Sequence, residues 1–488
     1  MVPAPLHHQG SPNRAARHRA RLARPQGGKA ECVPLVAYAN RLPVSRGRQG
    51  WRPSAGGLVS ALRPALESRG GAWVGWDGGA DDMPRRVEGL DVDLLPVRLS
   101  RREVEDYYHG FANRTLWPLL HGLIEQPVFE RRWWRAYRDV NERFAAVEVD
   151  GGGLRWVHDY HLMLVPSLLR RAHGGPIGFF LHVPFPPPEV YARLPWREQV
   201  LDGLLGADVV SFHTDAYRDN FVRTCARLRE DVHVEGRTIA LARRRVRTAA
   251  HPISIDARAL AEDARSSATE RSLRGLRAQF GERRIVLGVD RLDYTKGIIE
   301  RLRAIELLLE GRPELRGDFA FVQIAVPSRG EIREYRDLRR NVEELVGRIN
   351  GRFTDPGGDV PVYYLYRGVP QERLLAYYRL AEVCLVTPLA DGMNLVAKEF
   401  VTAQAAGGGA GALVLSEFTG AAVELRDALR CNPFDVAGLA DTIAHALQLD
   451  EADRRRRIER MAAGVARRDV YWWTEQELAA AGEARTAA

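Results

Sequence analysis

The sequence predicts an α/β protein made of two facing Rossmann-like domains, each a parallel β-sheet wound with helices. From residue 34 onward, short runs of β-branched residues alternate with segments of helical period, a pattern typical of such sheets. The 488 residues also exceed what one hydrophobic core usually supports, which predicts two domains of about 200 residues each. Because parallel sheets bind ligands at the carboxyl ends of their strands, we expect the functional site in the cleft between the domains.

The predicted strands fall into two series. The first comprises Leu35–Ala39, Leu154–His158, Gly178–His182 and Val209–Phe212, with an aromatic-rich insertion from Trp73 to Phe144. A basic, hairpin-like segment follows at Arg237–Ala250. The second series comprises Ile285–Val289, Phe319–Ala325, Val362–Tyr366, Val383–Thr387 and Ala412–Leu415. Amphipathic helices are predicted between most of these strands.

The domain boundary is predicted near His251-Pro252. We expect a first domain at 34–250, a second at 251–465, and a C-terminal helix at 466–488 that returns to the first domain. Residues 1–33 are rich in Pro, Gly, Arg and Ala and predict a disordered basic extension. This extension lacks the apolar central region of a secretory signal.

Composition excludes several classes of protein. No apolar run approaches the length of about 20 residues that spans a bilayer, so we expect no membrane partner. The net charge is +8, but residues 1–30 carry six basic residues and no acidic one, which leaves about +2 for the rest. We therefore expect no nucleic-acid partner. The four cysteines lack metal-ligand or redox spacing, which favours reduced thiols and a cytoplasmic protein; they are Cys32, Cys225, Cys384 and Cys431.

Lysine usage points to a phosphate site. Only three of the 71 basic residues are lysines, and two of them, Lys296 and Lys398, lie in the most patterned segments. A lysine ammonium is compact and reaches a single phosphate oxygen in a tight pocket better than the broad arginine fork does. Lys296 is therefore the first candidate for a phosphate ligand, whereas we expect Lys398 on an exposed helix face.

The segment that contains Lys296 predicts a diphosphate site. It runs from the strand at Ile285 through Arg291-Leu-Asp-Tyr-Thr-Lys-Gly into an apolar-periodic helix. Arg291 and Lys296 thus flank a helix N-terminus, where unpaired amides and a partial positive charge attract anions. The alternative is that both cations are merely solvated charges beside the helix.

A second segment predicts a sugar and ribose site. The strand Val383–Thr387 ends before Asp391-Gly-Met-Asn, and the next helix carries Glu399 on or beside its apolar face. A carboxylate there needs a hydrogen-bond partner, which ribose hydroxyls would provide. The alternative is a buried Glu399 satisfied by backbone. Asp391 is placed to accept hydrogen bonds from sugar hydroxyls, and Gly392 allows close approach of a ligand.

Polar groups also end strands of the first series. The Gly56-Gly57 pair before a helix is weak evidence alone, because a simple turn is commoner. His158-Asp159-Tyr160-His161 and His182-Val-Pro-Phe-Pro follow two predicted strands. The histidines lack the carboxylate spacing typical of a zinc enzyme, so we expect neither a metal nor a cofactor.

Taken together, these motifs resemble the trehalose-phosphate synthase family over about residues 34 to 475. The motifs that carry the resemblance are Arg41, Gly56-Gly57, Trp76, Tyr107-Tyr108, Trp117, His158 to His161, His182-Val-Pro-Phe-Pro, Arg291 to Gly297, Ser328-Arg329-Gly330 and Asp391 to Glu399. Thr295 departs from the serine common in the family, and the basic extension is additional. The resemblance implies a GT-B glycosyltransferase that moves glucose from a nucleotide-glucose, expected to be UDP-glucose, to glucose 6-phosphate.

The resemblance also implies roles for individual residues. The residues implied to bind glucose 6-phosphate are Arg41, Trp76, Tyr108, Trp117 and Arg329. Those implied to bind the nucleotide-glucose are Gly57, Arg291, Lys296, Asp391, Met393, Asn394, Leu395, Val396 and Glu399. Those implied to be catalytic are Arg291, Lys296, His182 and Asp159.

Members of this family transfer glucose with retention of configuration and without a metal, and we expect a homo-oligomer. Two other functions stay open from the residues. One is a relative with another acceptor, such as a glycerol phosphate or an aminocyclitol phosphate, and the other is a non-catalytic sugar-phosphate sensor. The donor base, whether uracil, guanine or adenine, is not decided by the sequence.

Overall fold

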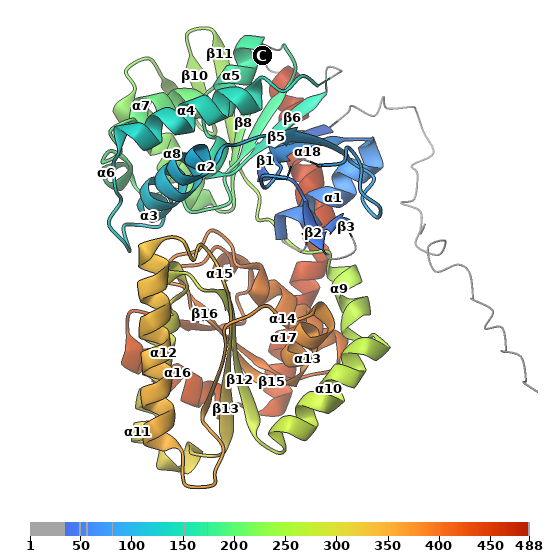
Figure 1. Ribbon diagram of the computed structural model, residues 1–488, viewed down its shortest axis with the longest axis vertical. Coiled ribbons are helices and arrows are strands. Elements are labelled where there is room, and N and C mark those ends of the chain that lie inside the picture. The colour runs from blue at the N-terminus through green and yellow to red at the C-terminus, as the bar shows by residue number, and fades with distance from the viewer. Residues whose placement is uncertain are drawn as a thin grey trace, which may run out of the picture. The chain divides into compact units, whose positions relative to one another are not determined.

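Two β-sheets flanked by helices dominate the structure and confirm the predicted α/β class (Figure 1). The structure is a computed structural model that describes residues 35–47, 50–54, 57–80, 82–149, 153–172 and 174–486. The predicted extension at 1–33, Cys32 and Gly56 lie outside the described residues. We call residues 35–250 the first half and residues 251–486 the second half.

The first sheet has nine strands. Its spatial order is β5 (Asp93–Val97), β4 (Ala72–Trp76), β1 (Leu35–Arg41), β6 (Leu154–His158), β7 (Ile177–Phe180), β8 (Val209–Phe212), β11 (Arg244–Ala250), β10 (Thr238–Leu241) and β9 (His233–Glu235). The strands from β5 to β11 are parallel, while β10 and β9 are antiparallel additions. All four predicted strands and the hairpin are present. Sequence reasoning missed β4 and β5, which lie inside the presumed insertion, and a small separate hairpin of β2 (Val44–Gly47) and β3 (Gly50–Pro53).

The second sheet is parallel throughout and has six strands. Its order is β14 (Val362–Leu365), β13 (Phe319–Val326), β12 (Arg284–Arg291), β15 (Ala381–Val386), β16 (Ala412–Ser416) and β17 (Leu429–Cys431). The five predicted strands are present, and only β17 was missed. The central strand β12 is buried from Ile285 to Asp290 and becomes exposed at Arg291, so Arg291 marks the carboxyl edge of the sheet.

Helices connect the strands. Those of the first half are α1 (Gly57–Arg69), α2 (Arg101–Glu103), the π-helical η1 (Val104–Leu116), α3 (Trp117–Leu120), α4 (Arg131–Ala145), η2 (Tyr160–Leu162), α5 (Val165–Ala172), α6 (Pro188–Tyr191), α7 (Arg197–Leu204) and α8 (Asp215–Leu228). Those of the second half are α9 (Ala257–Ala264), α10 (Ser267–Phe280), η3 (Tyr294–Lys296), α11 (Ile298–Gly311), η4 (Pro313–Leu315), α12 (Arg333–Phe353), α13 (Gln371–Leu380), α14 (Leu395–Ala406), α15 (Ala421–Glu424), α16 (Val436–Gln448), α17 (Glu451–Arg467) and α18 (Val470–Thr486).

Alternation along the strands builds a core on each face of the second sheet. Val286 of β12 joins the cluster formed with α11, α12 and α16. Ile285 and Leu287 join the cluster formed with α10, α13, α14 and α17. Because both faces are covered, the central strands are mostly apolar, as expected for a parallel sheet, with Asp290 and Gln323 as buried polar exceptions. None of the described helices is long and apolar enough to cross a membrane.

The prediction that Lys398 is exposed was wrong. Helix α14 packs against α17, α9 and α13, so its polar positions are enclosed along with its apolar ones. Lys398 is 1% exposed, donates to the carbonyl of Ile253 at 2.8 Å and forms an ion pair with Glu424 at 2.6 Å. Lys398 therefore forms a buried structural ion pair.

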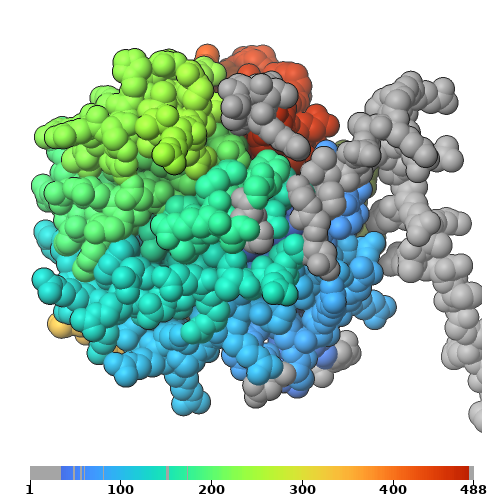
Figure 2. Space-filling view, turned by 90° about the horizontal axis from the view of Figure 1, so that it is seen from above, coloured from blue at the N-terminus to red at the C-terminus, as the bar shows by residue number. Residues whose placement is uncertain are grey.

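The chain leaves the first sheet near His251 and its last helix returns to it near Val470, and these two segments are joined by hydrogen bonds. The amide of Val470 donates to the carbonyl of Ile255 at 3.0 Å, and His251 contacts the buried carboxylate of Glu477 at 2.6 Å. Helix α18 then packs against α1, β8 and β11 of the first half. Figure 2 shows this C-terminal segment, in red, at the surface formed by the first half.

Candidate active site

The turn after β12 presents Lys296 to the site. The chain leaves the sheet at Arg291, forms the short turn η3, and enters α11 through Gly297. Gly297 has φ of +64°, and a Cβ there would lie 2.3 Å from the carbonyl oxygen of Thr387. Glycine is required because the conformation is left-handed and the loop after β15 passes directly against it.

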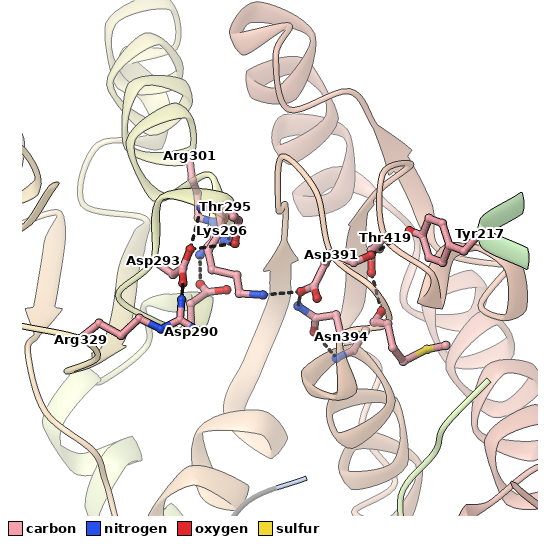
Figure 3. Close-up of polar contacts among 12 residues, drawn as sticks. Tyr217, Asp290, Asp293, Thr295, Lys296, Arg301, Arg329, Asp391, Asn394 and Thr419 are labelled. Carbon is pink, nitrogen blue, oxygen red and sulfur yellow. Dashed lines mark hydrogen bonds and ion pairs between the residues drawn. The ribbon is translucent and has the colours of Figure 1, made fainter. Parts of the chain in front are cut away.

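Lys296 and Asp391 form the central ion pair of the site. The Lys296 Nζ lies 2.6 Å from Asp391 Oδ2, and the Asn394 amide donates to the same oxygen at 3.1 Å (Figure 3). Burial acts to raise the pKa of Asp391, but the charge and hydrogen bond of Lys296 lower it below its usual value. The pair brings together the two motifs that the sequence predicted to bind the donor.

The loop at Asp391 also touches the first half of the chain. Tyr217 of α8 donates its hydroxyl to the Asp391 carbonyl at 3.1 Å. A Cβ on Gly392 would lie 2.3 Å from the carbonyl oxygen of His182. Thr419 binds the carbonyl of Met393 through its hydroxyl. The loop is thereby fixed from both halves of the chain.

Glu399 has a hydrogen-bond partner of its own. The Tyr378 hydroxyl donates to Glu399 Oε2 at 2.9 Å, so the partner is a side chain rather than the backbone. Burial raises the pKa of Glu399. Leu395 and Val396 open the helix α14 beside it and are partly buried. Asn394 caps this helix by accepting from the Ala397 amide at 3.3 Å.

A pocket of about 220 Å³ lies between the halves of the chain. It is lined by Asn40, Arg41, Tyr108, Trp117, His121, Asp159, Tyr160, His161, His182, Val183, Arg291, Arg329 and Asp391. Eight of the predicted site residues are in this lining, drawn from both halves of the chain. The carboxyl ends of β1, β6 and β12 supply several of them, as the sheet rule predicts.

Arg41 is a cation that lies against aromatic rings. Its guanidinium carbon is 4.5 Å from the ring centre of Trp76 and 5.3 Å from that of Tyr108. Arg41 is exposed, and within the described part of the chain no carboxylate forms an ion pair with its side chain. The arrangement leaves its donors available to an anion in the pocket.

Arg329 reaches the pocket from the second half. Its side chain is 5% exposed, pairs with Asp293 at 3.0 Å, and donates to the Tyr160 hydroxyl at 3.1 Å. Its guanidinium carbon lies 4.0 Å from the ring centre of Trp117. Burial acts to raise the pKa of Asp293, but nearby cations, Arg329 first, lower it to about 2.

The cations change the chemistry of Tyr108. Burial works to raise the pKa of its hydroxyl, but the charges of Arg329 and Arg41 lower it below the usual value. The Tyr108 ring also stacks on His161 with ring centres 5.8 Å apart. A phenol in such a field is a good hydrogen-bond donor to an anion.

Asp159 and His182 lie together at the ends of β6 and β7. The backbone amide of His182 donates to Asp159 Oδ1 at 3.3 Å, and Asp159 has φ of +75°. Burial raises the pKa of Asp159 to about 6 and lowers that of His182 to about 3. The Nε2 atom of His182 lies 3.1 Å from Nδ1 of the buried His158. A neutral His182 is therefore held in a fixed orientation.

Some predicted residues lie apart from the pocket lining, and some lining residues were missed. Lys296, Asn394 and Trp76 contact lining residues, whereas Glu399 lies further along α14 and Gly57 opens α1. The missed residues include Asn40 and His121. Asn40 precedes Arg41 at the same strand end and was detectable on that basis. His121 lies after the π-helical segment and carried no sequence signal.

The described residues show no group of three or more His, Cys, Asp or Glu side chains arranged for a metal ion. The three described cysteines, Cys225, Cys384 and Cys431, are buried and free, in line with the predicted reduced thiols. The histidines considered as metal ligands have other contacts. His158 and His182 bond to each other, and His161 stacks on Tyr108.

Residues 34–482 match glycosyltransferase family 20. The trehalose-6-phosphate synthase of Mycobacterium marinum is 47% identical over 474 residues, covering 92% of this chain and 94% of that protein. The crystal structure of a UDP-forming α,α-trehalose-phosphate synthase from Burkholderia vietnamiensis is 38% identical with a TM-score of 0.86, covering 93% of this chain and 99% of that one.

Two further solved structures contain ligands. One from E. coli, bound with UDP-2-fluoro glucose, is 35% identical with a TM-score of 0.84 and covers 92% of this chain and 98% of that one. One from Burkholderia xenovorans, in complex with glucose-6-phosphate, is 34% identical with a TM-score of 0.84 and covers 92% of this chain and 100% of that one. With its two Rossmann-like sheets in the GT-B arrangement, the chain belongs to glycosyltransferase family 20.

Proposed function

We propose that this glycosyltransferase moves glucose from UDP-glucose to glucose 6-phosphate, giving α,α-trehalose 6-phosphate and UDP. The observation that carries the proposal is the charge distribution around one pocket. Arg41 of the first half and Arg291 and Arg329 of the second half line the pocket. Lys296 lies next to it and binds the lining residue Asp391. Two substrates that each carry phosphate fit two separate sets of cations.

The donor lies against the second half in this proposal. Arg291 and Lys296 contact its diphosphate, Glu399 binds the ribose hydroxyls, and Asp391 binds the glucose. The amides from Met393 to Val396 complete the donor set at the start of α14, where a helix N-terminus favours an anion. We also assign Gly57 to the donor side. The complex of a related E. coli structure with UDP-2-fluoro glucose supports a uridine donor.

The acceptor lies toward the first half. Arg41, Tyr108 and Arg329 bind its phosphate, and Trp76 with Trp117 lines the sugar. Two guanidiniums and a phenol suit a dianion, and aromatic rings cover the apolar faces of a sugar. The glucose-6-phosphate complex of the related B. xenovorans structure supports this class of acceptor.

The transfer breaks the bond between the glucose anomeric carbon and the diphosphate oxygen, and the electron pair leaves with UDP. The acceptor 1-hydroxyl forms the new bond on the same face, and its proton passes to the departing phosphate oxygen. Configuration is thus retained without an enzyme nucleophile. Arg291 and Lys296 stabilise the negative charge that grows on the diphosphate, an effect that is largest in a closed site.

Asp159 and His182 orient the reacting sugars. A neutral His182 can donate or accept a hydrogen bond with a sugar hydroxyl, and its carbonyl lies beside Gly392 where the two substrates meet. In this proposal Asp159 and His182 fix the orientation of the two sugars and do not carry the transferred proton.

Further features belong to the same proposal. We divide the chain into an acceptor domain at 34–250, a donor domain at 251–465 and a returning helix at 466–488, consistent with the packing of α18 on α1. The reaction needs no metal in this scheme, because the two cations perform the charge stabilisation. We further propose a cytoplasmic homo-oligomer.

Product analysis tests the function. The purified chain is incubated with UDP-, GDP- or ADP-glucose, each paired with glucose 6-phosphate or glycerol 3-phosphate, and products are identified by mass spectrometry. We expect a disaccharide phosphate from UDP-glucose and glucose 6-phosphate. Glycerol glucosylation would favour the alternative acceptor, and ligand binding without turnover would favour a sensor. Arg41→Leu should raise the KM for glucose 6-phosphate while the KM for UDP-glucose stays near the parent value.

A further inference from the structure

Arg301 is a fully buried cation in the first turn of α11, and its side chain is 0% exposed. Its guanidinium makes four hydrogen bonds to four different residues. The partners are Asp290 Oδ2 at 2.6 Å, Gln323 Oε1 at 2.7 Å, Thr387 Oγ1 at 3.0 Å and the carbonyl oxygen of Lys296 at 3.3 Å. A buried guanidinium is stable only when its charge is paired and its donors have partners. Here Asp290 pairs the charge, and each of the three nitrogens has at least one hydrogen-bond partner.

The guanidinium has two sides with different neighbours. One nitrogen, Nη1, binds Asp290 and Gln323, which belong to the adjacent strands β12 and β13. The other two, Nε and Nη2, bind the Thr387 hydroxyl and the Lys296 carbonyl, which belong to the two loops that hold the proposed donor ligands. One side of the guanidinium therefore binds the sheet, and the other side binds the two loops.

The room for this guanidinium is built into the sheet. A Cβ on Gly288 of β12 would lie 2.4 Å from Gln323 Oε1 and 2.6 Å from Arg301 Nη1. A glycine at that position, in an otherwise bulky buried strand, leaves the space that the cluster occupies.

We propose that Arg301 is a positioning residue for the transfer reaction, which holds the Lys296 turn and the loop from Thr387 to Asp391 in fixed register. The proposal rests on the proposed role of Lys296. The same two loops meet again where the Leu389 amide donates to the Thr295 carbonyl at 2.7 Å and where Lys296 pairs with Asp391 at 2.6 Å. Arg301 is the side chain that binds both loops at their base.

Loss of this contact should move the Lys296 ammonium relative to the diphosphate. A misplacement of about 1 Å can lower a rate about 100-fold. A lysine at position 301 retains the charge that Asp290 needs, but its single ammonium cannot span Thr387 and the Lys296 carbonyl as well. Arg301→Lys therefore keeps the buried positive charge and removes the contacts that hold the two loops.

The experiment compares three single variants with the parent by steady-state kinetics with UDP-glucose and glucose 6-phosphate, and by thermal unfolding. Arg301→Lys should lower kcat at least about tenfold while the KM for glucose 6-phosphate stays within about twofold. Gln323→Met is the matched control, because it removes a partner on the sheet side only. It should lower the unfolding temperature but keep kcat within about threefold of the parent. Thr387→Val, which removes a partner on the loop side and no charge, should lower kcat even if Arg301→Lys does not fold.

Combination with Lys296→Ala gives the decisive comparison. If Arg301 acts through Lys296, Arg301→Lys lowers kcat by less than about threefold in the Lys296→Ala background. Two results would overturn the inference and leave the proposed function intact. In the first, Arg301→Lys lowers kcat by the same factor in both backgrounds. In the second, Thr387→Val and Arg301→Lys have the same kcat as Gln323→Met. Parent-like turnover of Lys296→Ala alone overturns the proposed role of Lys296 and this inference with it.

Discussion

Replacement of Lys296 by methionine should lower both stability and turnover, for separable reasons. In the structure the ammonium lies 2.6 Å from Asp391 Oδ2, and the two side chains are 9% and 14% exposed. With an effective dielectric constant of about 20, the attraction at this distance is about 6 kcal/mol. Lys296→Met removes it and leaves a mostly buried carboxylate without its cation.

The net cost is smaller than the attraction. Asp391 can take up a proton, which costs about 4 kcal/mol at pH 7 from an ordinary carboxyl pKa. We therefore expect Lys296→Met to lower the free energy of unfolding by about 2 to 4 kcal/mol at pH 7. The pKa of Asp391 is lowered in the parent, so the pair stabilises the fold above the ordinary carboxyl pKa and loses this effect as pH falls through the lowered value. The difference between variant and parent should narrow as the pH approaches 4.

Urea unfolding gives the stability, and release of UDP in a coupled assay gives the turnover. The double variant Lys296→Met with Asp391→Asn should recover most of the lost stability, because no charge is then left unpaired. It should not recover turnover, because the cation that faces the diphosphate is still absent. A Lys296→Met variant as stable as the parent, or a double variant with restored turnover, would refute this reasoning.

Three further variants test other parts of the site. Asp159→Asn should raise the free energy of unfolding by about 1 to 3 kcal/mol above pH 6 while turnover falls, since the folded carboxyl pKa is raised to about 6; this gain should vanish below pH 4 in urea titrations. Glu399→Gln should raise the KM for UDP-glucose about tenfold in initial-rate assays and leave that for glucose 6-phosphate unchanged. Gly392→Ala should abolish most turnover, because its Cβ would lie 2.3 Å from the His182 carbonyl oxygen, whereas Gly347→Ala, with open space around it, serves as the control.

Each of these has a contradicting result. A pH-independent effect of Asp159→Asn on stability would show that its carboxyl is not perturbed by burial. Equal KM changes for both substrates in Glu399→Gln would remove that residue from the ribose site. Parent-like turnover of Gly392→Ala would mean that the loop and the His182 carbonyl are not in close contact during the reaction.

The sequence predicted the architecture because hydrophobic runs mark buried parallel strands. Leu154–His158 and Val209–Phe212 have the predicted bounds, and all nine predicted strands exist. Strands β4 and β5 were missed because they lie among aromatic residues that also fit a loop or helix. Hydrophobic periodicity indicates which residues are buried, but it does not distinguish a short buried strand from a helix or a loop with the same apolar residues.

Site residues at strand ends were predictable, whereas long-range partners were not. Arg291 is the last residue of β12 and Asp391 lies in the loop after β15, so the sheet rule placed both at one edge. The sequence did not predict that Arg329 would bind Asp293 and Tyr160, or that Arg301 would be fully buried. Those contacts depend on how separate segments pack, which local pattern does not encode. The burial of Lys398 was missed for the same reason.

The most direct test of the account is a crystal structure of this chain with UDP and glucose 6-phosphate bound together. We predict that the diphosphate oxygens lie within about 3 Å of Lys296 Nζ and the Arg291 guanidinium, with the second phosphate against Arg41 and Arg329. Side chains of Arg291 and Lys296 directed away from the diphosphate, with the nucleotide bound elsewhere, would contradict the account.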